Sequence, residues 1–122
     1  SDLGAAYAIS SLAQVQLKSG AADEAETNAL RALELLGGRT DHLAEIGNAQ
    51  LVLGRSLLEQ ERLAEAEELF RAAEASFDRL DSDSHRAAAW MAQGDLAARR
   101  GDVAGAARLY RSAAECLQDF NF

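Results

Sequence analysis

The sequence predicts an all-α fold made of three tandem antiparallel helix hairpins, six helices in total. Three observations lead to this prediction. Alanine is abundant and proline is absent, and these residues are the best and the worst helix formers. Apolar residues recur with the period of a helix between short polar connectors. A pattern of small residues also returns three times, so the hairpins should be copies of one unit.

The repeated pattern places small and apolar residues at the same register in each copy. Each copy has a leading alanine, then a small or bulky residue one helical turn on, then a second alanine. The copies are Ala25-Ala29-Ala32, Ala66-Phe70-Ala73 and Ala106-Tyr110-Ala113. Their period of about 40 residues is typical of a stack of supersecondary units and favours a binding surface over a catalytic cleft.

The first hairpin is expected from helices over 3–19 and 22–36. Gly20 ends the first helix and Gly37 the second, because glycine readily takes the backbone conformation that closes a helix. The residues that form the two apolar faces are Leu3, Tyr7, Ile9, Leu12, Ala13 and Leu17, and then Ala25, Ala29, Ala32, Leu33 and Leu36.

The second hairpin is expected from helices over 41–60 and 62–79. Thr40 or Asp41 should be the N-cap of its first helix, because a short polar side chain can accept the free backbone N–H groups there. The apolar faces consist of Leu43, Ile46, Leu53, Gly54 and Leu57, and then Leu63, Ala66, Leu69, Phe70, Ala73 and Phe77.

The third hairpin is expected from helices over 84–100 and 103–118. The polar connector 81–84 precedes it, and Gly101 with Asp102 supplies a turn and an N-cap. The apolar faces consist of Trp90, Gly94, Ala97 and Ala98, and then Ala106, Tyr110, Ala113 and Leu117. All connectors are short, so successive helices should be antiparallel neighbours.

The recurring small residues indicate close packing within each hairpin. Gly54 and Gly94, with Ala13 in the first copy, should let the second helix of the hairpin approach the first. Phe70 and Tyr110 should fill the space between adjacent hairpins, so the first copy, which has Ala29 at that position, should pack more loosely.

Charge and composition argue against several classes of protein. The net charge is −8 and the pI is about 4.7, whereas phosphate backbones are bound by clustered Lys and Arg, so direct contact with nucleic acid is not expected. No apolar run approaches the length of a membrane helix. The single cysteine, Cys116, fits a reducing compartment, and with no secretory leader visible we expect a cytoplasmic protein.

The three copies resemble the tetratricopeptide repeat. The third copy carries Trp90, Gly94, Gly101, Ala106, Tyr110 and Ala113 at the family's spacing, the second carries Leu53, Gly54, Ala66, Phe70 and Ala73, and the first carries Leu12, Gly20, Ala25 and Ala32. The resemblance implies a right-handed superhelical solenoid. It would form a single domain over 1–122 with repeats at about 3–37, 41–79 and 83–118.

The repeats differ from the usual family pattern in two ways. The repeats are longer than is usual in the family and contain no proline. Long repeats of this kind resemble those of large bacterial transcriptional regulators and the kinesin light chain. The segment 109–120 resembles the C-terminal end of the repeat regions of actinobacterial helix-turn-helix regulators, and the preference for Arg over Lys suits a GC-rich genome of that kind. Because the chain begins within a helical pattern and without an initiator Met, we expect it to be a fragment of a longer protein.

In tetratricopeptide arrays the first helix of each hairpin lines a concave face, and the resemblance places the candidate peptide-binding site there. Leu51 and Met91 would be apolar anchors, and Arg55 or Arg99 would meet a carboxylate of the partner. The alternative is that these are ordinary solvated residues. The candidate residues are Tyr7, Ser10, Gln14, Lys18, Asn48, Leu51, Arg55, Leu58, Met91, Asp95 and Arg99, with Leu17, Ala88 and Ala98 beside them. Chaperone docking is not expected, since Ser10 and Gln14 stand where the family's Lys and Asn carboxylate clamp would begin.

No catalytic or metal site is predicted, and no cofactor. His42 and His85 lack partners at metal-ligand spacing and should be surface residues. Cys116 has no histidine expected near it and should be a small buried or interface residue. The carboxylates of 59–68 form no matched acid–base pair, and Trp90 should pack within the third hairpin. We therefore expect a protein that is not an enzyme.

The leading interpretation is a protein–protein or peptide interaction module, the sensor or scaffold region of a cytosolic transcriptional regulator. One alternative is a structural self-association unit that forms a homo-oligomer through its C-terminal end, where Leu117, Phe120 and Phe122 lack a covering helix. Another is a small-molecule-sensing accessory domain with a pocket between hairpins, to which Met91 would contribute.

Overall fold

The computed structural model describes residues 1–118 and confirms the all-α fold. Six α-helices and one short 3-10 helix make up the described part, and it contains no strand. The elements are α1 (Asp2–Lys18), α2 (Ala22–Leu36), η1 (Thr40–His42), α3 (Leu43–Glu59), α4 (Leu63–Asp78), α5 (Asp83–Arg99) and α6 (Val103–Gln118).

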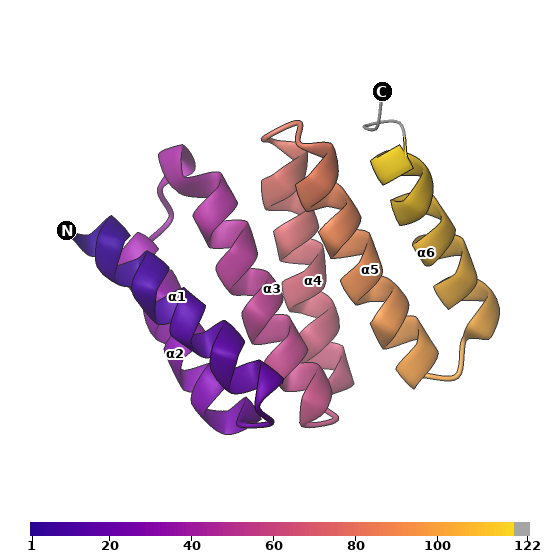
Figure 1. Ribbon diagram of the computed structural model, residues 1–122, viewed down its shortest axis with the longest axis horizontal. Coiled ribbons are helices and arrows are strands. Elements are labelled where there is room, and N and C mark those ends of the chain that lie inside the picture. Colours follow the sequence, from indigo (N-terminus) through magenta and orange to yellow (C-terminus); the bar gives the residue numbers. More distant parts are fainter. Residues whose placement is uncertain (119–122) are drawn as a thin grey trace.

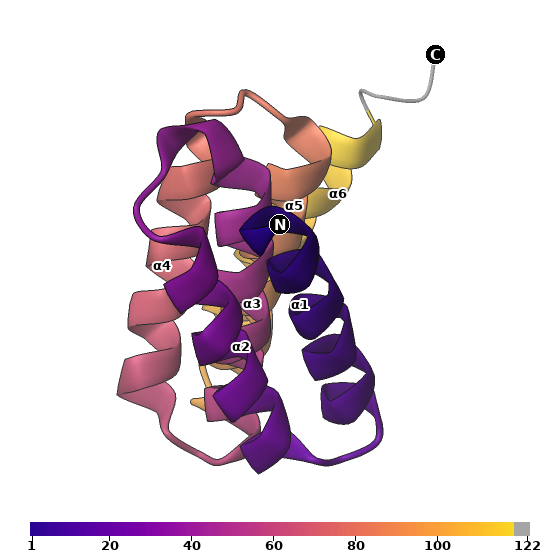
Figure 2. The same ribbon diagram turned by 90° about the vertical axis from the view of Figure 1, so that its left-hand side faces the viewer.

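The helices pair into three hairpins that lie side by side along the long axis of the molecule (Figure 1). Each first helix also contacts the hairpin before it, since α2 contacts α3 and α4 contacts α5. The first helices contact one another in turn, α1 with α3 and α3 with α5. In the end-on view α1 lies on one side of α3, and α2 and α4 lie on the other (Figure 2). The first helices therefore form one continuous layer.

Glycines allow the two helices of a hairpin to approach each other, as the sequence predicted. A Cβ atom added at Gly54 would lie 2.5 Å from Cε1 of Phe70, and one added at Gly94 would lie 2.5 Å from Cε1 of Tyr110. Gly47 meets the ring of Phe77 in the same way. A side chain at these points would have to push the ring aside, so glycine lets the ring pack directly against the helix.

The core runs through all three hairpins. Its largest cluster joins residues of α1 to α5: Ala13, Ala25, Ala29, Val52, Leu53, Leu57, Leu58, Ala66, Phe70, Ala92 and Leu96. Charged pairs at the edges of this core join adjacent hairpins. Arg62 donates to Glu26 at 3.0 Å, and Arg100 donates to Glu67 at 2.8 Å.

The helix ends lie within one residue of the predictions except at the start of the third helix. The Asp102 side chain caps α6 as predicted, accepting the backbone N–H of Gly105 at 2.9 Å. The predicted N-cap of the third helix, Thr40 or Asp41, is wrong. These two residues belong to η1 instead, and α3 begins at Leu43 with His42 as a cap residue that makes no side-chain capping bond.

The hairpin turns share one backbone position that takes a positive φ. Gly20 and Gly101 occupy it in the first and third hairpins, with φ of 87° and 82°. Glu61 occupies it in the second, with φ of 61°. A residue with a side chain is strained in this conformation. Glu61 adopts it and forms an ion pair with Arg99 of the next hairpin.

Candidate functional site

Three adjoining cavities line the side of the molecule formed by the first helices. Two lie between α1 and α3, with volumes of about 200 and 320 Å³, and share Gln14 and Asn48. The third, of about 430 Å³, lies between α3 and α5 and shares Arg55 with the second. Because each cavity shares residues with the next, we treat them as one feature, the inner groove.

The inner groove brings together ten of the eleven residues predicted from the sequence. They are Tyr7, Ser10, Gln14, Lys18, Asn48, Leu51, Arg55, Leu58, Asp95 and Arg99. Met91 does not line the three cavities, although its side chain is exposed. Leu58 lines the third cavity but is buried in the core, so it offers little surface to a ligand. Whether these residues bind a partner stays a prediction.

Sequence reasoning missed several groove residues. Ser11, Leu36 and Glu45 line the first cavity, and Tyr110, assigned only to packing, lines the third. Helical spacing was a usable signal for Glu45, because it precedes Asn48 by three positions and so shares its face of α3.

One polar network crosses the third cavity. Arg55 on α3 donates to Asp95 Oδ2 on α5 at 2.7 Å. The hydroxyl of Tyr110 on α6 donates to the other oxygen, Asp95 Oδ1, at 2.5 Å. This hydrogen bond, together with partial burial and the negative charge of Asp95, raises the pKa of Tyr110 above its ordinary value. The network therefore links three helices through a single carboxylate.

Both arginines predicted to meet a partner's carboxylate already have acidic partners within the chain. Arg55 is paired with Asp95. Arg99 is paired with Glu61 and, at 3.5 Å, with Glu59, and it also donates to the Leu58 carbonyl oxygen at 3.1 Å. A ligand carboxylate would have to displace these groups. Within residues 1–118, Lys18 and Glu45 form no ion pair, so they are the uncommitted charges of the inner groove.

Other reactive side chains serve packing and local structure. His42 is half-buried beside Asp41 rather than a surface residue. His85 is also half-buried, with its ring 4.9 Å from that of Phe77 and Nδ1 2.7 Å from the Ser82 hydroxyl. Cys116 Sγ donates to the Asp83 carbonyl oxygen at 3.4 Å. In the described part of the chain, no cluster of three or more His, Cys, Asp or Glu residues is arranged to hold a metal ion.

Trp90 packs between hairpins rather than only within the third. Its indole Nε1–H donates to Glu74 Oε2 on α4 at 3.2 Å, and Gln93 donates to the other oxygen of Glu74 at 2.7 Å. The ring also borders a shallow cavity next to Ser112 and Cys116 of α6. Of the apolar C-terminal residues predicted to be uncovered, Leu117 is exposed, while Phe120 and Phe122 lie outside the described residues.

Comparison with known proteins agrees with the hairpin architecture. No helix among residues 1–118 is long and apolar enough to cross a membrane. A search of curated proteins found no match. A protein-family model described as tetratricopeptide repeat matches residues 10–80 and again residues 51–119. These two spans together cover most of the sequence, and the chain therefore belongs to the tetratricopeptide repeat family.

Proposed function

We propose that this chain is a non-catalytic module that binds a peptide segment of a partner protein in the inner groove. Tetratricopeptide repeats generally mediate protein–protein interaction, and the family match makes that class of function the starting point. The observation that carries the proposal is the continuity of the three cavities across α1, α3 and α5. Concave surfaces of this kind are where repeat arrays bind extended partners.

The lining of the inner groove suggests which peptides fit. Leu17, Leu51 and Val52 give its middle cavity an apolar floor. Gln14 and Asn48 stand over that floor with amide groups that can hydrogen-bond a peptide backbone. Lys18 lies at the end of α1, and Glu45 lies near the start of α3. These positions favour a segment with apolar side chains in the middle, an acidic residue near Lys18 and a basic residue near Glu45.

We further propose that the module serves a cytoplasmic transcriptional regulator as its sensor or scaffold region. The support is the likeness of the long repeats and of segment 109–120 to regulators of that kind. Binding of a peptide in the inner groove would then act on an output domain elsewhere in the regulator.

A selected-peptide experiment tests the binding proposal. A random-peptide library displayed on phage is selected against the immobilised protein, and fluorescence anisotropy then measures the affinity of the recovered peptides. Leu51→Asp and Asn48→Ala should each weaken binding by about tenfold or more, or about 1.4 kcal/mol. Arg31→Ala and Glu68→Ala, at exposed positions on the second helices, are the matched controls.

Either of two results would overturn the proposal. One is that no peptide is recovered, and the other is that the recovered peptides bind the groove variants as tightly as the unmodified protein. A thermal shift with small molecules and none with the selected peptides would favour the small-molecule-sensing alternative.

A further inference from the structure

The repeat register shows that both ends of the array expose apolar positions that are covered inside it. Ala13, Gly54 and Gly94 occupy the same position in the three hairpins, and this equivalence aligns all other positions. In such a stack each hairpin covers the face of its neighbour. Among residues 1–118, the first and last hairpins each contact one other hairpin, so their outward faces can be compared directly with the covered ones.

The outward face of α1 carries an apolar stripe, which we call the N-terminal stripe: Ala5, Ala8, Leu12 and Val15. Leu12 is 48% exposed and Val15 is 64% exposed. The equivalent residues of α3 are buried beneath the first hairpin: Ala49, Leu53 and Ser56. In α5 the equivalents of Ala8 and Val15 are Ala89 and Leu96, and both are buried against the second hairpin.

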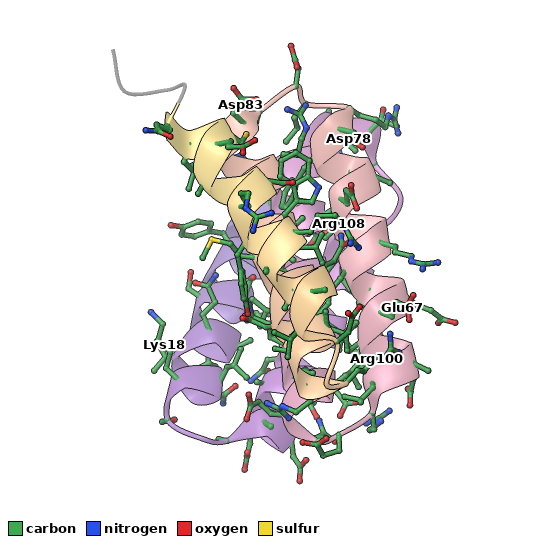
Figure 3. The ribbon with its side chains drawn as sticks, turned by 90° about the vertical axis from the view of Figure 1, so that its right-hand side faces the viewer. Lys18, Glu67, Asp78, Asp83, Arg100 and Arg108 are labelled. Atoms are coloured by element: carbon green, nitrogen blue, oxygen red, sulfur yellow. The ribbon has the colours of Figure 1, made fainter. Side chains whose placement is uncertain are left out.

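The outward face of α6 carries a matching apolar stripe, which we call the C-terminal stripe: Val103, Ala107, Tyr110, Ala114 and Leu117. Val103 is 77% exposed, and Tyr110 and Leu117 are each 38% exposed. Phe70 and Phe77 occupy the equivalent positions of α4 and are fully buried. Figure 3 looks directly at this face, where α6 lies outermost and is covered by no other helix of residues 1–118.

Charges also distinguish the end faces from the covered ones. Inside the array, charged and polar residues of α4 pair with residues of α5 across the junction between hairpins: Glu67 with Arg100, Glu74 with Gln93, and Asp78 with Arg86. Figure 3 shows Glu67 and Arg100 close together. The N-terminal stripe has Ala5 where α5 has Arg86, and the C-terminal stripe has Ala107 and Ala114 where α4 has Glu67 and Glu74. The stripes therefore lack the charged residues that pair across the junctions inside the array.

We propose that these two faces bind each other in separate copies of the chain, so that the N-terminal stripe of one molecule packs on the C-terminal stripe of the next. The contact has the same geometry as the junction between consecutive hairpins, but alanines stand at the positions that carry charged residues inside the array. Neither stripe contains a charged residue, so packing one stripe on the other buries no unpaired charge from the stripes themselves, which is a condition for a stable contact. Because the contact joins two different surfaces, it adds copies head to tail into an open stack rather than closing a dimer.

This assembly adjoins the inner groove at Tyr110, which lines the third cavity and also belongs to the C-terminal stripe. The groove lies on another side of the first helices, and the stack places α1 of the next copy beside α5, which lengthens the layer of first helices. Two charge effects oppose the assembly. Each molecule carries a net charge of −8, and Lys18 of one copy would face Arg99 of the other, at the position where Glu59 pairs with Arg99 within the chain. Salt screens both repulsions, so association should strengthen as ionic strength rises.

Sedimentation analysis of the chain from micromolar to millimolar concentration tests the proposal. The average mass should rise with concentration from 13.0 kDa and continue past the dimer. Val15→Asp on the N-terminal stripe and Val103→Asp on the C-terminal stripe should each abolish this rise. Leu30→Asp, which replaces an exposed leucine of α2 outside both stripes, is the matched control and should leave it unchanged.

Mixing the two stripe variants gives the sharpest readout. Val15→Asp keeps a working C-terminal stripe, and Val103→Asp keeps a working N-terminal stripe, so the mixture should form a dimer and stop there. Circular dichroism should show the helix content of the unmodified chain in both variants, because the changed side chains are exposed.

Three results would overturn the proposal: a monomer at every concentration and salt level, self-association that persists in either stripe variant, or a mixture of the variants that stays monomeric. Val15 and Val103 are not among the residues that line the three cavities, so both variants should still bind the selected peptides, and the two proposals fail separately.

Discussion

The second and third hairpins use the same glycine–aromatic contact in different surroundings. Gly54 meets Phe70, and Gly94 meets Tyr110, at the same distance. The ring of Phe70 is also covered by the core cluster that includes Ala92 and Leu96 of α5, so it is fully buried. Among residues 1–118 no helix lies beyond the ring of Tyr110, whose hydroxyl donates a hydrogen bond to Asp95. One repeat position thus carries a core residue in one copy and a groove residue in the next.

The largest expected effect separates the two rings. Phe70→Ala should destabilise the protein by about 3 to 5 kcal/mol, because it leaves a large cavity at the centre of the core. Tyr110→Ala should cost less, since part of that ring already contacts solvent. Chemical denaturation of both variants measures the difference, and equal losses would contradict the distinction drawn between the hairpins.

Substituting the two glycines should also destabilise the second hairpin more than the third, but by smaller free energies of unfolding than substituting the rings. Gly54→Ala forces a methyl group against Phe70, which cannot move in the packed core, and the expected loss is about 1 to 3 kcal/mol. Gly94→Ala should cost less, because the half-exposed Tyr110 can turn away. Thermal unfolding compares the two substitutions. A larger loss at Gly94 would show that the network around Asp95 holds Tyr110 more rigidly than packing holds Phe70.

A third substitution examines the turns. Gly101→Ala places a side chain at a φ of 82° and should cost about 1 kcal/mol, the usual penalty for a left-handed L-residue. The second hairpin already accepts this strain at Glu61. Glu61→Gly relieves the strain but removes the ion pair with Arg99, so its net effect should be the smaller of the two. Denaturation midpoints of both variants check this order.

The smallest effect is a pH dependence confined to the third hairpin. The pKa of Tyr110 is raised from its ordinary value of 10.0 by its hydrogen bond to Asp95. The neutral phenol is the form favoured by folding, so this stabilisation is complete below pH 10.0 and is lost as the pH rises through the raised value. Tyr110→Phe should remove that part of the alkaline loss of stability. An unchanged pH profile in this variant would show that the hydrogen bond contributes nothing to folding.

The architecture was predictable because local rules agree with one another. Helix-forming residues, glycine breakers and the period of about 40 residues all indicate the same hairpins. The resemblance to tetratricopeptide arrays, combined with helical spacing, indicated which side of the first helices would form a common surface, and ten candidate residues line the inner groove. The start of α3 was missed because capping residues such as Thr40 serve equally well in a 3-10 turn.

The pairing of the groove arginines was not predicted. Arg55 pairs with Asp95 and Arg99 pairs with Glu59, and both pairs join positions that are equivalent in consecutive repeats. The repeat period holds this information, because equivalent positions of adjacent first helices lie side by side. Helix periodicity within a single hairpin does not reveal these ion pairs, because the partner of each arginine lies on the neighbouring hairpin.

The arrangement of contacts has a consequence for how the chain folds. Every helix pair with substantial contact in residues 1–118 belongs to the same hairpin or to adjacent ones. Ordering a distant part of the chain is therefore never needed before a contact forms, and such topologies fold fast. The middle hairpin is supported on both sides and should retain its amide hydrogens longest in exchange experiments, while the outer helices α1 and α6 open first.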